Sequence, residues 1–523
     1  MFKSVAHSLR LARAGRVLAA HDALLPAHRR DDLPLPARIL LRAAKLGNRT
    51  RPPSGEHPVA TALARLGPSF IKLGQFLATR ADLVGAELAG DLAQLQDRLP
   101  PFPQAEAVAE LRAAFGHDSQ TLFAEFGPPV AAASIAQVHR ARTSEDRDVA
   151  VKILRPGIEQ QFDDDLESFF FAARFIERWH EPARRLRPVE AVATLAASVK
   201  LEMDLRMEAS AIAEMAANVK DDPDFRVPDV DWSRTQRRVL TTEWIDGVSL
   251  GDIAGLQQAG FDPVQIAETL IQSFLRHAIR DGFFHADMHP GNLFVDKRGV
   301  LAAVDFGIMG RLTVKERRFL AEILFGFITR DYRRVSLTHF DAGYVPDHHD
   351  PALFAQALRA IGEPLMDRTA DDISMAGLLT QLFQVTGQFD MQTQPQLLLL
   401  QKTMVVVEGV ARTLNPRLNM WVTAEPVVRS WIEAKLGPQA RLEEAAEGAL
   451  SLGRMVSAFP EVLSEAQKAA HMLSEMTRAG GVKLDPESTE ALARAQARHD
   501  RPTRMALWIA AGAMLALLAW QVF

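Results

Sequence analysis

The sequence predicts an α+β fold, and three observations support this prediction. Short runs rich in β-branched residues, typical of strands, occur at Asp148–Leu154, Arg237–Ile245 and Leu293–Phe306. Long stretches rich in Ala, Leu and Glu separate them, and from about Thr313 onward the pattern is almost wholly helical. Hydrophobic residues make up 48% and charged residues 24% of the 523 residues, which disfavours collagen-like, disordered and polytopic membrane proteins.

Residues 1–60 form a basic, amphipathic N-terminal segment. The first 51 residues contain eleven Lys and Arg but only three Asp and Glu, although the net charge of the whole chain is -5. The basic side chains stand among Leu, Val and Ala at roughly helical spacing. Three interpretations remain open, namely a helix on an anionic membrane surface, a mitochondrial transit peptide, and short solvated helices packed on the body.

The C-terminal end predicts a membrane anchor. Residues 505–523 carry no charge, and their one polar side chain is Gln521. As a helix this run reaches roughly 28 Å, close to the thickness of the bilayer's hydrocarbon core. Trp508 and Trp520 fall near its two ends, and two arginines precede it, so we predict one transmembrane helix with the large domain in the cytoplasm. A buried or interfacial helix is the alternative. Residues 441–504 are the expected helical linker.

The strongest motif runs from His285 to Asn292 and is followed by Asp305-Phe306-Gly307. Phosphoryl transfer requires metal ions that bridge phosphates and a group that orients the acceptor. Carboxylate and amide oxygens suit Mg²⁺. Asp287 and Asn292 are five residues apart, as in the kinase catalytic loop, and the Asp-Phe-Gly element follows in the kinase order.

Lys152 ends the strand Val149-Ala150-Val151-Lys152, which matches the kinase pattern in which a strand lysine contacts the phosphates and a helix glutamate. Glu208 is the natural partner. Residues 242–247 stand where a kinase hinge presents backbone groups to adenine.

The expected glycine-rich phosphate loop is absent. In its place stand Ala131, Ala132, Ala133, Ser134, Ile135, Ala136, Gln137 and Val138, which are the candidate nucleotide-binding residues together with Lys152. Alanine does not adopt positive φ cheaply, so this loop should cradle phosphates less closely than a glycine loop.

Composition excludes several other functions. Without any cysteine, the chain cannot use disulfides, thiol catalysis or Cys-ligated iron-sulfur clusters. The near-neutral net charge gives no reason to expect nucleic-acid binding.

These motifs, with the segment Leu66–Gln75 that holds Lys72 and Gln75, and with Glu202 and Asp204, resemble the UbiB family of atypical kinases. The resemblance covers roughly Leu66–Arg412 and favours the bacterial branch. It implies a protein-kinase-like two-lobed fold with a helical extension at 61–125, an N-lobe with inserted helices at 126–250 and a C-lobe at 251–440.

The resemblance also implies roles for single residues. Lys152 would pair with Glu208 and with the phosphates of ATP, Asn292 and Asp305 would hold Mg²⁺, and Asp287 would be the catalytic-loop aspartate. The regulatory residues would lie on or beside a helix that folds over the active site, with Lys72 pairing with Glu202: Lys72, Gln75, Glu202 and Asp204.

By the same resemblance, the expected function is a kinase or ATPase of the bacterial inner membrane that supports ubiquinone biosynthesis. It would act on or organise polyprenyl-phenol or quinone intermediates and their enzymes at the membrane. The alternatives are a Ser/Thr protein kinase acting in trans and an ATP-gated scaffold. No Ala-Pro-Glu follows Asp305-Phe306-Gly307, so the usual peptide-docking segment is missing. A polyprenylphenol hydroxylase role would be indirect, since no flavin motif or facial triad is present.

Three further groups have simpler interpretations. His348 and His349 stand between two aspartates and could bind a metal, but a solvated loop is the favoured interpretation. Residues 163–165 are a cluster of aspartates near a helix start, and residues 169–171 are phenylalanines expected in a core.

Overall fold

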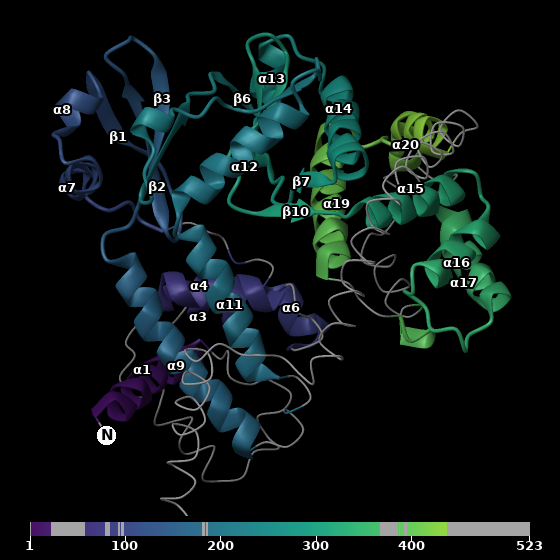
Figure 1. Ribbon diagram of the computed structural model, residues 1–523, viewed down its shortest axis with the longest axis horizontal. Helices are drawn as coiled ribbons and strands as arrows, with labels where there is room; N and C mark the ends of the chain where they lie inside the picture. Colours follow the sequence, from purple (N-terminus) through teal and green to yellow (C-terminus); the bar gives the residue numbers. More distant parts are fainter. Residues whose placement is uncertain are drawn as a thin grey trace, which may run out of the picture. The chain divides into compact units, whose positions relative to one another are not determined.

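The computed structural model describes residues 2–21, 58–78, 84–92, 95, 99–179, 184, 187–366, 385, 387–391 and 395–436 (Figure 1). Within these ranges no helix is both long enough and apolar enough to cross a membrane. The predicted linker 441–504 and the predicted anchor 505–523 lie outside the described residues.

The N-terminal lobe is built on an antiparallel sheet with the order β1-β2-β3-β5. Its strands are β1 (Glu125–Ala132), β2 (Ala136–Arg142), β3 (Asp148–Leu154) and β5 (Val239–Glu243). In β3 the side chains of Val149, Val151 and Ile153 are buried, whereas those of Ala150 and Lys152 are partly exposed. This alternation directs Lys152 to the face opposite the core.

The core of this sheet includes a helix that the sequence assigned to the extension. Helix α7 (Gln104–Phe115) contributes Ala107 and Leu111 to the same hydrophobic cluster as the buried face of β3. The short helix α8 (Ser119–Leu122) connects α7 to β1. Residues from about 99 onward therefore complete the N-terminal lobe.

Among the described residues between β3 and β5 are the helices α9 (Ile158–Trp179), α11 (Pro188–Glu202) and α12 (Leu205–Asn218). Four helices of the N-terminal region gather beside α9 and α11 (Figure 1), namely α1 (Phe2–Ala20), α3 (Pro58–Leu66), α4 (Pro68–Ala78) and α6 (Ala86–Leu92). The rings of Phe70 in α4 and Phe169 in α9 meet edge to face with centroids 5.0 Å apart. Arg10 of α1 pairs with Asp164 of α9 at 2.6 Å. This packing matches the alternative that placed the basic N-terminal helix on the body.

The C-terminal lobe begins with small sheets and continues as helices. One sheet has the order β4-β9-β8-β6, and β7 pairs with β10. These strands are β4 (Phe225–Arg226), β6 (Gly247–Ser249), β7 (Phe283–His285), β8 (Leu293–Asp296), β9 (Leu301–Ala303) and β10 (Met309–Arg311). The run Leu293–Phe306 thus contains the hairpin β8-β9.

The helices of this lobe are α13 (Ile253–Gln258), α14 (Pro263–Leu275), α15 (Val314–Ile328), α16 (Tyr332–Asp341), α17 (Pro351–Met366), α19 (Pro395–Leu414) and α20 (Met420–Leu436). A capping box between Thr313 and Glu316 starts α15, and the described residues after Thr313 are mostly helical, as expected from the sequence. Helix α14 packs against α19. Helix α19 also reaches the segment between β7 and β8, where Thr403 contacts the carbonyl oxygen of Ala286.

Candidate active site

Lys152 joins three separate elements at the face of the N-terminal sheet. Its Nζ lies 2.9 Å from both carboxylate oxygens of Glu208 on α12 and 3.0 Å from Oδ1 of Asp305. The side chains of Lys152 and Glu208 are 14% and 7% exposed, whereas that of Asp305 is 45% exposed. The structure therefore brings together the lysine, the helix glutamate and the aspartate that the sequence identified separately.

The charges of this cluster depend on one another. Burial acts to lower the pKa of Lys152, but Asp305 and Glu208 outweigh it and raise the pKa above its ordinary value. Burial raises the pKa of Glu208 to about 7, although Lys152 acts in the opposite direction. Burial also acts to raise the pKa of Asp305, yet Lys152 outweighs it and holds that pKa below its usual range. Asp305 is thus the more firmly ionised of the two carboxylates.

The backbone of Asp305 is fixed in the left-handed region, with φ of 61°. Aspartate and asparagine tolerate this conformation better than other side chains do, because their short polar groups bond locally. The N–H of Gly307 lies 3.4 Å from Oδ1 of Asp305 and donates to it. This turn aims the carboxylate at Lys152 and leaves it partly open to solvent.

The catalytic loop is ordered by a buried histidine. The N–H of Asp287 donates to Nδ1 of His285 at 3.0 Å, and Nε2 of the same ring lies 3.2 Å from the carbonyl oxygen of Val304. Nδ1 accepts this hydrogen bond, so Nε2 carries the ring hydrogen and donates to the carbonyl oxygen of Val304. Burial lowers the pKa of His285, which keeps this neutral form. His285 therefore ties the catalytic loop to the strand that leads into Asp305.

Asn292 is positioned by its amide. Its side-chain Nδ2 donates to the carbonyl oxygen of Asp287 at 3.1 Å. Its backbone carbonyl oxygen accepts from the N–H of Val304 at 2.8 Å. Since the amide nitrogen faces the loop, the other end of the amide, Oδ1, is directed elsewhere. A metal ligand at this position would use that oxygen. Asp287 keeps a half-exposed carboxylate whose Oδ2 lies 3.8 Å from Nε2 of His289.

The alanine-rich loop is held from behind by Arg155. The guanidinium donates to the carbonyl oxygen of Ala133 from Nε at 3.1 Å and from Nη2 at 2.8 Å, and Nη2 also donates to Pro100. Ser134 and Ile135 are buried, and no residue from 131 to 138, all of them described, has a positive φ. The loop is therefore an extended, anchored turn rather than a flexible glycine cradle.

Two predicted nucleotide-binding residues occupy different positions. Val138 pairs with Lys152 across β2 and β3, so both side chains lie on the same face of the sheet. Gln137 points into the lobe, where its Oε1 accepts from Phe102 N–H at 2.9 Å and its Nε2 donates to Nε2 of His139 at 2.9 Å. The side chain of Gln137 is thus used to join the sheet to the chain before α7.

The predicted regulatory residues lie on α4, α11 and the short connection to α12. Nζ of Lys72 forms an ion pair with Glu202 at 2.6 Å, as the family resemblance implies. A Cβ built at Gly74 would collide with Leu63 and Leu95, so this position of the motif packs too closely for a side chain. Asp204 caps α12 and receives the guanidinium of Arg206 at 2.7 Å. The structure places Gln75 on the same helix as Lys72.

Two contacts that support the site are not indicated by any motif in the sequence. Oγ1 of Thr403 on α19 is buried and lies 3.2 Å from the carbonyl oxygen of Ala286, next to Asp287. Arg311 of β10 forms a bidentate pair with Glu214 of α12 at 2.6 and 2.5 Å. Both join residues far apart in the chain, and no local motif marks a threonine or an arginine for such a contact.

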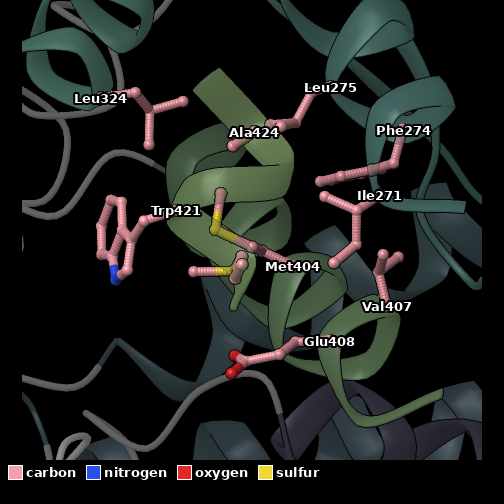
Figure 2. A pocket seen from close by; sticks show the side chains of 10 residues that line it. Ile271, Phe274, Leu275, Leu324, Met404, Val407, Glu408, Trp421 and Ala424 are labelled. Atoms are coloured by element: carbon pink, nitrogen blue, oxygen red, sulfur yellow. The ribbon is translucent and has the colours of Figure 1, made fainter. Parts of the chain in front are cut away.

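A separate small apolar pocket opens between α14, α15, α19 and α20 (Figure 2). Glu408 is the only acidic side chain that lines it, and burial raises the pKa of that carboxyl. The lining residues are Ile271, Phe274, Leu275, Leu324, Met404, Val407, Glu408, Met420, Trp421 and Ala424. None belongs to the Lys152 cluster or the catalytic loop.

Comparisons with known proteins agree with this geometry. Residues 94–339 match the ABC1 atypical kinase-like domain, and residues 358–419 match the UbiB helical domain. A protein of Marinobacter nauticus named Probable protein kinase UbiB is 37% identical over 91% of this chain and 86% of its own length. The protein of that name from Pseudomonas aeruginosa is 40% identical over 73% of this chain and 72% of its own. The solved complex of Rv3197 with erythromycin from Mycobacterium tuberculosis matches with a TM-score of 0.48 and 23% identity, covering 75% of this chain and 97% of that one.

Proposed function

The chain belongs to the UbiB family of atypical kinases, and from this premise we propose that it is a membrane-anchored kinase or ATPase that binds Mg-ATP and supports ubiquinone biosynthesis. The observation that carries the proposal is the contact of Lys152 with both Glu208 and Asp305. In kinases a strand lysine pairs with a helix glutamate and contacts the phosphates, and the aspartate of the Asp-Phe-Gly element holds Mg²⁺ beside it.

The side chains present fit Mg-ATP. Asp305 offers an ionised carboxylate, and Asn292 offers Oδ1 because its Nδ2 is used by the loop. These are hard oxygen ligands of the kind that Mg²⁺ prefers, and the ion would neutralise charge on the phosphates. Lys152 would contact the phosphates, and Asp287 would orient the acceptor hydroxyl.

Support for the lipid pathway comes from family membership and from the apolar C-terminal run. We propose that residues 505–523 anchor the chain in the inner membrane and leave the kinase-like domain in the cytoplasm. The substrates or ligands would then be polyprenyl-phenol or quinone intermediates, and the partners would be the enzymes that modify them.

ATP hydrolysis by the purified full-length chain tests the proposal. We expect hydrolysis to rise when vesicles containing anionic lipid and a phenolic quinone precursor are added, and to vanish in Asp305→Asn. Asp118→Asn, an exposed carboxylate in the same lobe, is the matched control and should behave as wild type. Hydrolysis that persists in Asp305→Asn would place the activity outside this site.

A protein kinase acting in trans is a second candidate, favoured by the name Probable protein kinase UbiB that the relatives carry. The segment after Asp305 argues against it, because β10 ends at Arg311 and α15 begins at Val314, which leaves almost no chain for a peptide-docking loop. Transfer of labelled phosphate to a defined membrane-enzyme partner, lost in Asp287→Ala, would establish it. Partner assembly that needs ATP binding but not hydrolysis would instead indicate an ATP-gated scaffold.

A further inference from the structure

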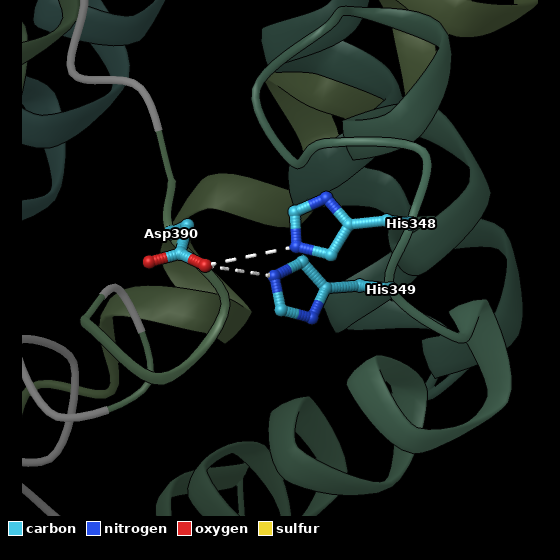
Figure 3. A group of neighbouring side chains, drawn as sticks. All are labelled: His348, His349 and Asp390. Atoms are coloured by element: carbon cyan, nitrogen blue, oxygen red, sulfur yellow. Dashed lines mark hydrogen bonds and ion pairs between the residues drawn. The ribbon is translucent and has the colours of Figure 1, made fainter.

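Three potential metal ligands meet in the C-terminal lobe, far along the chain from the kinase motifs (Figure 3). His348 and His349 lie in the loop between α16 and α17, and Asp390 lies in the described segment that precedes α19. The sequence showed only the two histidines. Asp390 joins them across a separation of 41 residues from His349, which only the folded chain brings about.

The distances fit a tetrahedral ion. Nε2 of His348 and Nε2 of His349 lie 3.7 and 3.3 Å from the same oxygen, Oδ2 of Asp390, and both approach it from one side (Figure 3). One ligand atom from each residue lies within 4.8 Å of the others. Zinc bound to His and carboxylate at about 2.0–2.2 Å would separate its ligands by about 3.3–3.5 Å in a tetrahedron. The two separations from Asp390 lie close to this spacing, and the remaining separation, between the two histidine nitrogens, is at most 4.8 Å.

The backbone on both sides is held in place. Phe389, directly before Asp390, is buried in the same hydrophobic cluster as Val345 and Phe354. The ring of His349 packs on Phe389 with centroids 5.4 Å apart. Asp390 itself adopts a left-handed φ of 47°. The ligands therefore stand on anchored chain, although His348 and Asp390 are mostly exposed.

Within the described residues, no lysine or arginine forms an ion pair with Asp390, and its polar side-chain partners are the two imidazoles. The rings of His348 and His349 lie side by side with centroids 4.1 Å apart and are tilted by 37° relative to each other. Both rings direct Nε2 toward the same oxygen of Asp390. This arrangement is expected where two imidazoles and a carboxylate bind one cation together.

We propose that His348, His349 and Asp390 bind one divalent ion of the zinc type, with water in the remaining position, and that the ion clips the α16–α17 loop to the segment before α19. Two imidazoles and one carboxylate suit Zn²⁺ rather than Mg²⁺, which prefers oxygen ligands. This site is chemically distinct from the proposed Mg²⁺ ligands Asn292 and Asp305, and it does not depend on the proposed kinase activity.

Zinc titration of the untagged full-length chain tests the inference. The metal-stripped protein is titrated against a chromogenic zinc chelator in excess Mg²⁺, which occupies hard oxygen sites. We expect one zinc per chain at this site, at least tenfold weaker binding in His348→Ala and in Asp390→Asn, and a higher midpoint of thermal unfolding when zinc is present. Asp347→Asn, an exposed carboxylate in the same loop, is the matched control and should bind as wild type.

Cobalt provides a second measurement that does not depend on stability. Co²⁺ at a tetrahedral site gives intense visible absorption, which His348→Ala should abolish while far-UV circular dichroism stays unchanged. His348 is 67% exposed, so its removal should not disturb folding. Zinc affinity and cobalt absorption that are the same in wild type, His348→Ala and Asp390→Asn would overturn the proposal.

Discussion

Two single variants, Glu208→Gln and Asp305→Asn, each remove one acidic partner of Lys152. We expect the first to lower local stability more and the second to abolish ATP hydrolysis at little cost in stability. In Glu208→Gln, Lys152 loses its buried, bidentate carboxylate and keeps only Asp305 at 3.0 Å. Breaking a buried ion pair typically costs about 3–5 kcal/mol. Since Asp305 remains as a partner of Lys152, we expect a smaller loss of about 2 kcal/mol in the free energy of local opening of β3 and α12.

In Asp305→Asn we expect the opposite outcome, a small loss of stability and a complete loss of ATP hydrolysis. Lys152 keeps both oxygens of Glu208, and the substituted side chain is 45% exposed. Asparagine also adopts a φ of 61° without new strain. The cost should therefore stay below about 1 kcal/mol, although ATP hydrolysis should be lost because the proposed Mg²⁺ ligand is removed.

Hydrogen exchange of the nucleotide-free protein measures the difference, because it reports local opening of β3 and α12 rather than unfolding of the whole chain. A loss of about 2 kcal/mol corresponds to roughly 30-fold faster exchange, and a loss below about 1 kcal/mol to less than about fivefold. Wild-type exchange in Glu208→Gln, or equally fast exchange in both variants, would refute the view that Glu208 is the principal buried partner of Lys152.

Three other predictions follow from single contacts. Thr403→Val should lower kcat by at most about fivefold, because it removes the hydroxyl proton that Oγ1 can donate to Ala286 or to Leu399 and a hydrogen bond is worth about 1 kcal/mol, whereas Thr403→Ser should retain activity. Lys72→Ala should raise autophosphorylation if its pairing with Glu202 restrains the kinase, and unchanged labelling from ATP would contradict that regulatory role. Burial lowers the pKa of His277 to about 3, so its contribution to stability is complete above about pH 6.5 and falls by about 1.4 kcal/mol per unit as the pH drops toward 3. In His277→Phe, urea unfolding midpoints should depend less on pH across that window than in wild type.

The sequence predicts the residues of the kinase-like centre because each motif is local. Strand β3 begins and ends where the β-branched run does. In the turn after β9, the left-handed φ of Asp305 itself sets the direction of its side chain. Family resemblance supplies the pairing of Lys72 with Glu202, which spacing alone would not reveal. These features depend on a few neighbouring residues, so a single sequence can show them.

Long-range contacts are different. Thr403 reaches Ala286 because α14 and α19 pack together, and nothing near Thr403 in the chain indicates this. Gln137 appears in a predicted phosphate loop, yet strand alternation and its bonds to Phe102 turn it into the lobe. Such positions depend on tertiary packing and become visible only in the folded chain.

The same packing joins α4, the helix that carries Lys72, to the candidate active site over a short path. Helix α11 ends at Glu202, which holds Lys72, and α12 begins at Leu205, so the two helices are joined by only two residues. Glu208 contacts Lys152 from the first turn of α12, and Glu214 contacts Arg311 from farther along the same helix. Because α12 is held at two points by the elements around Asp305, a displacement of α4 that moved Glu202 would have to rotate α12 or break one of these ion pairs. A movement of α12 is therefore the route by which the helix carrying Lys72 would affect the cluster of Lys152, Glu208 and Asp305.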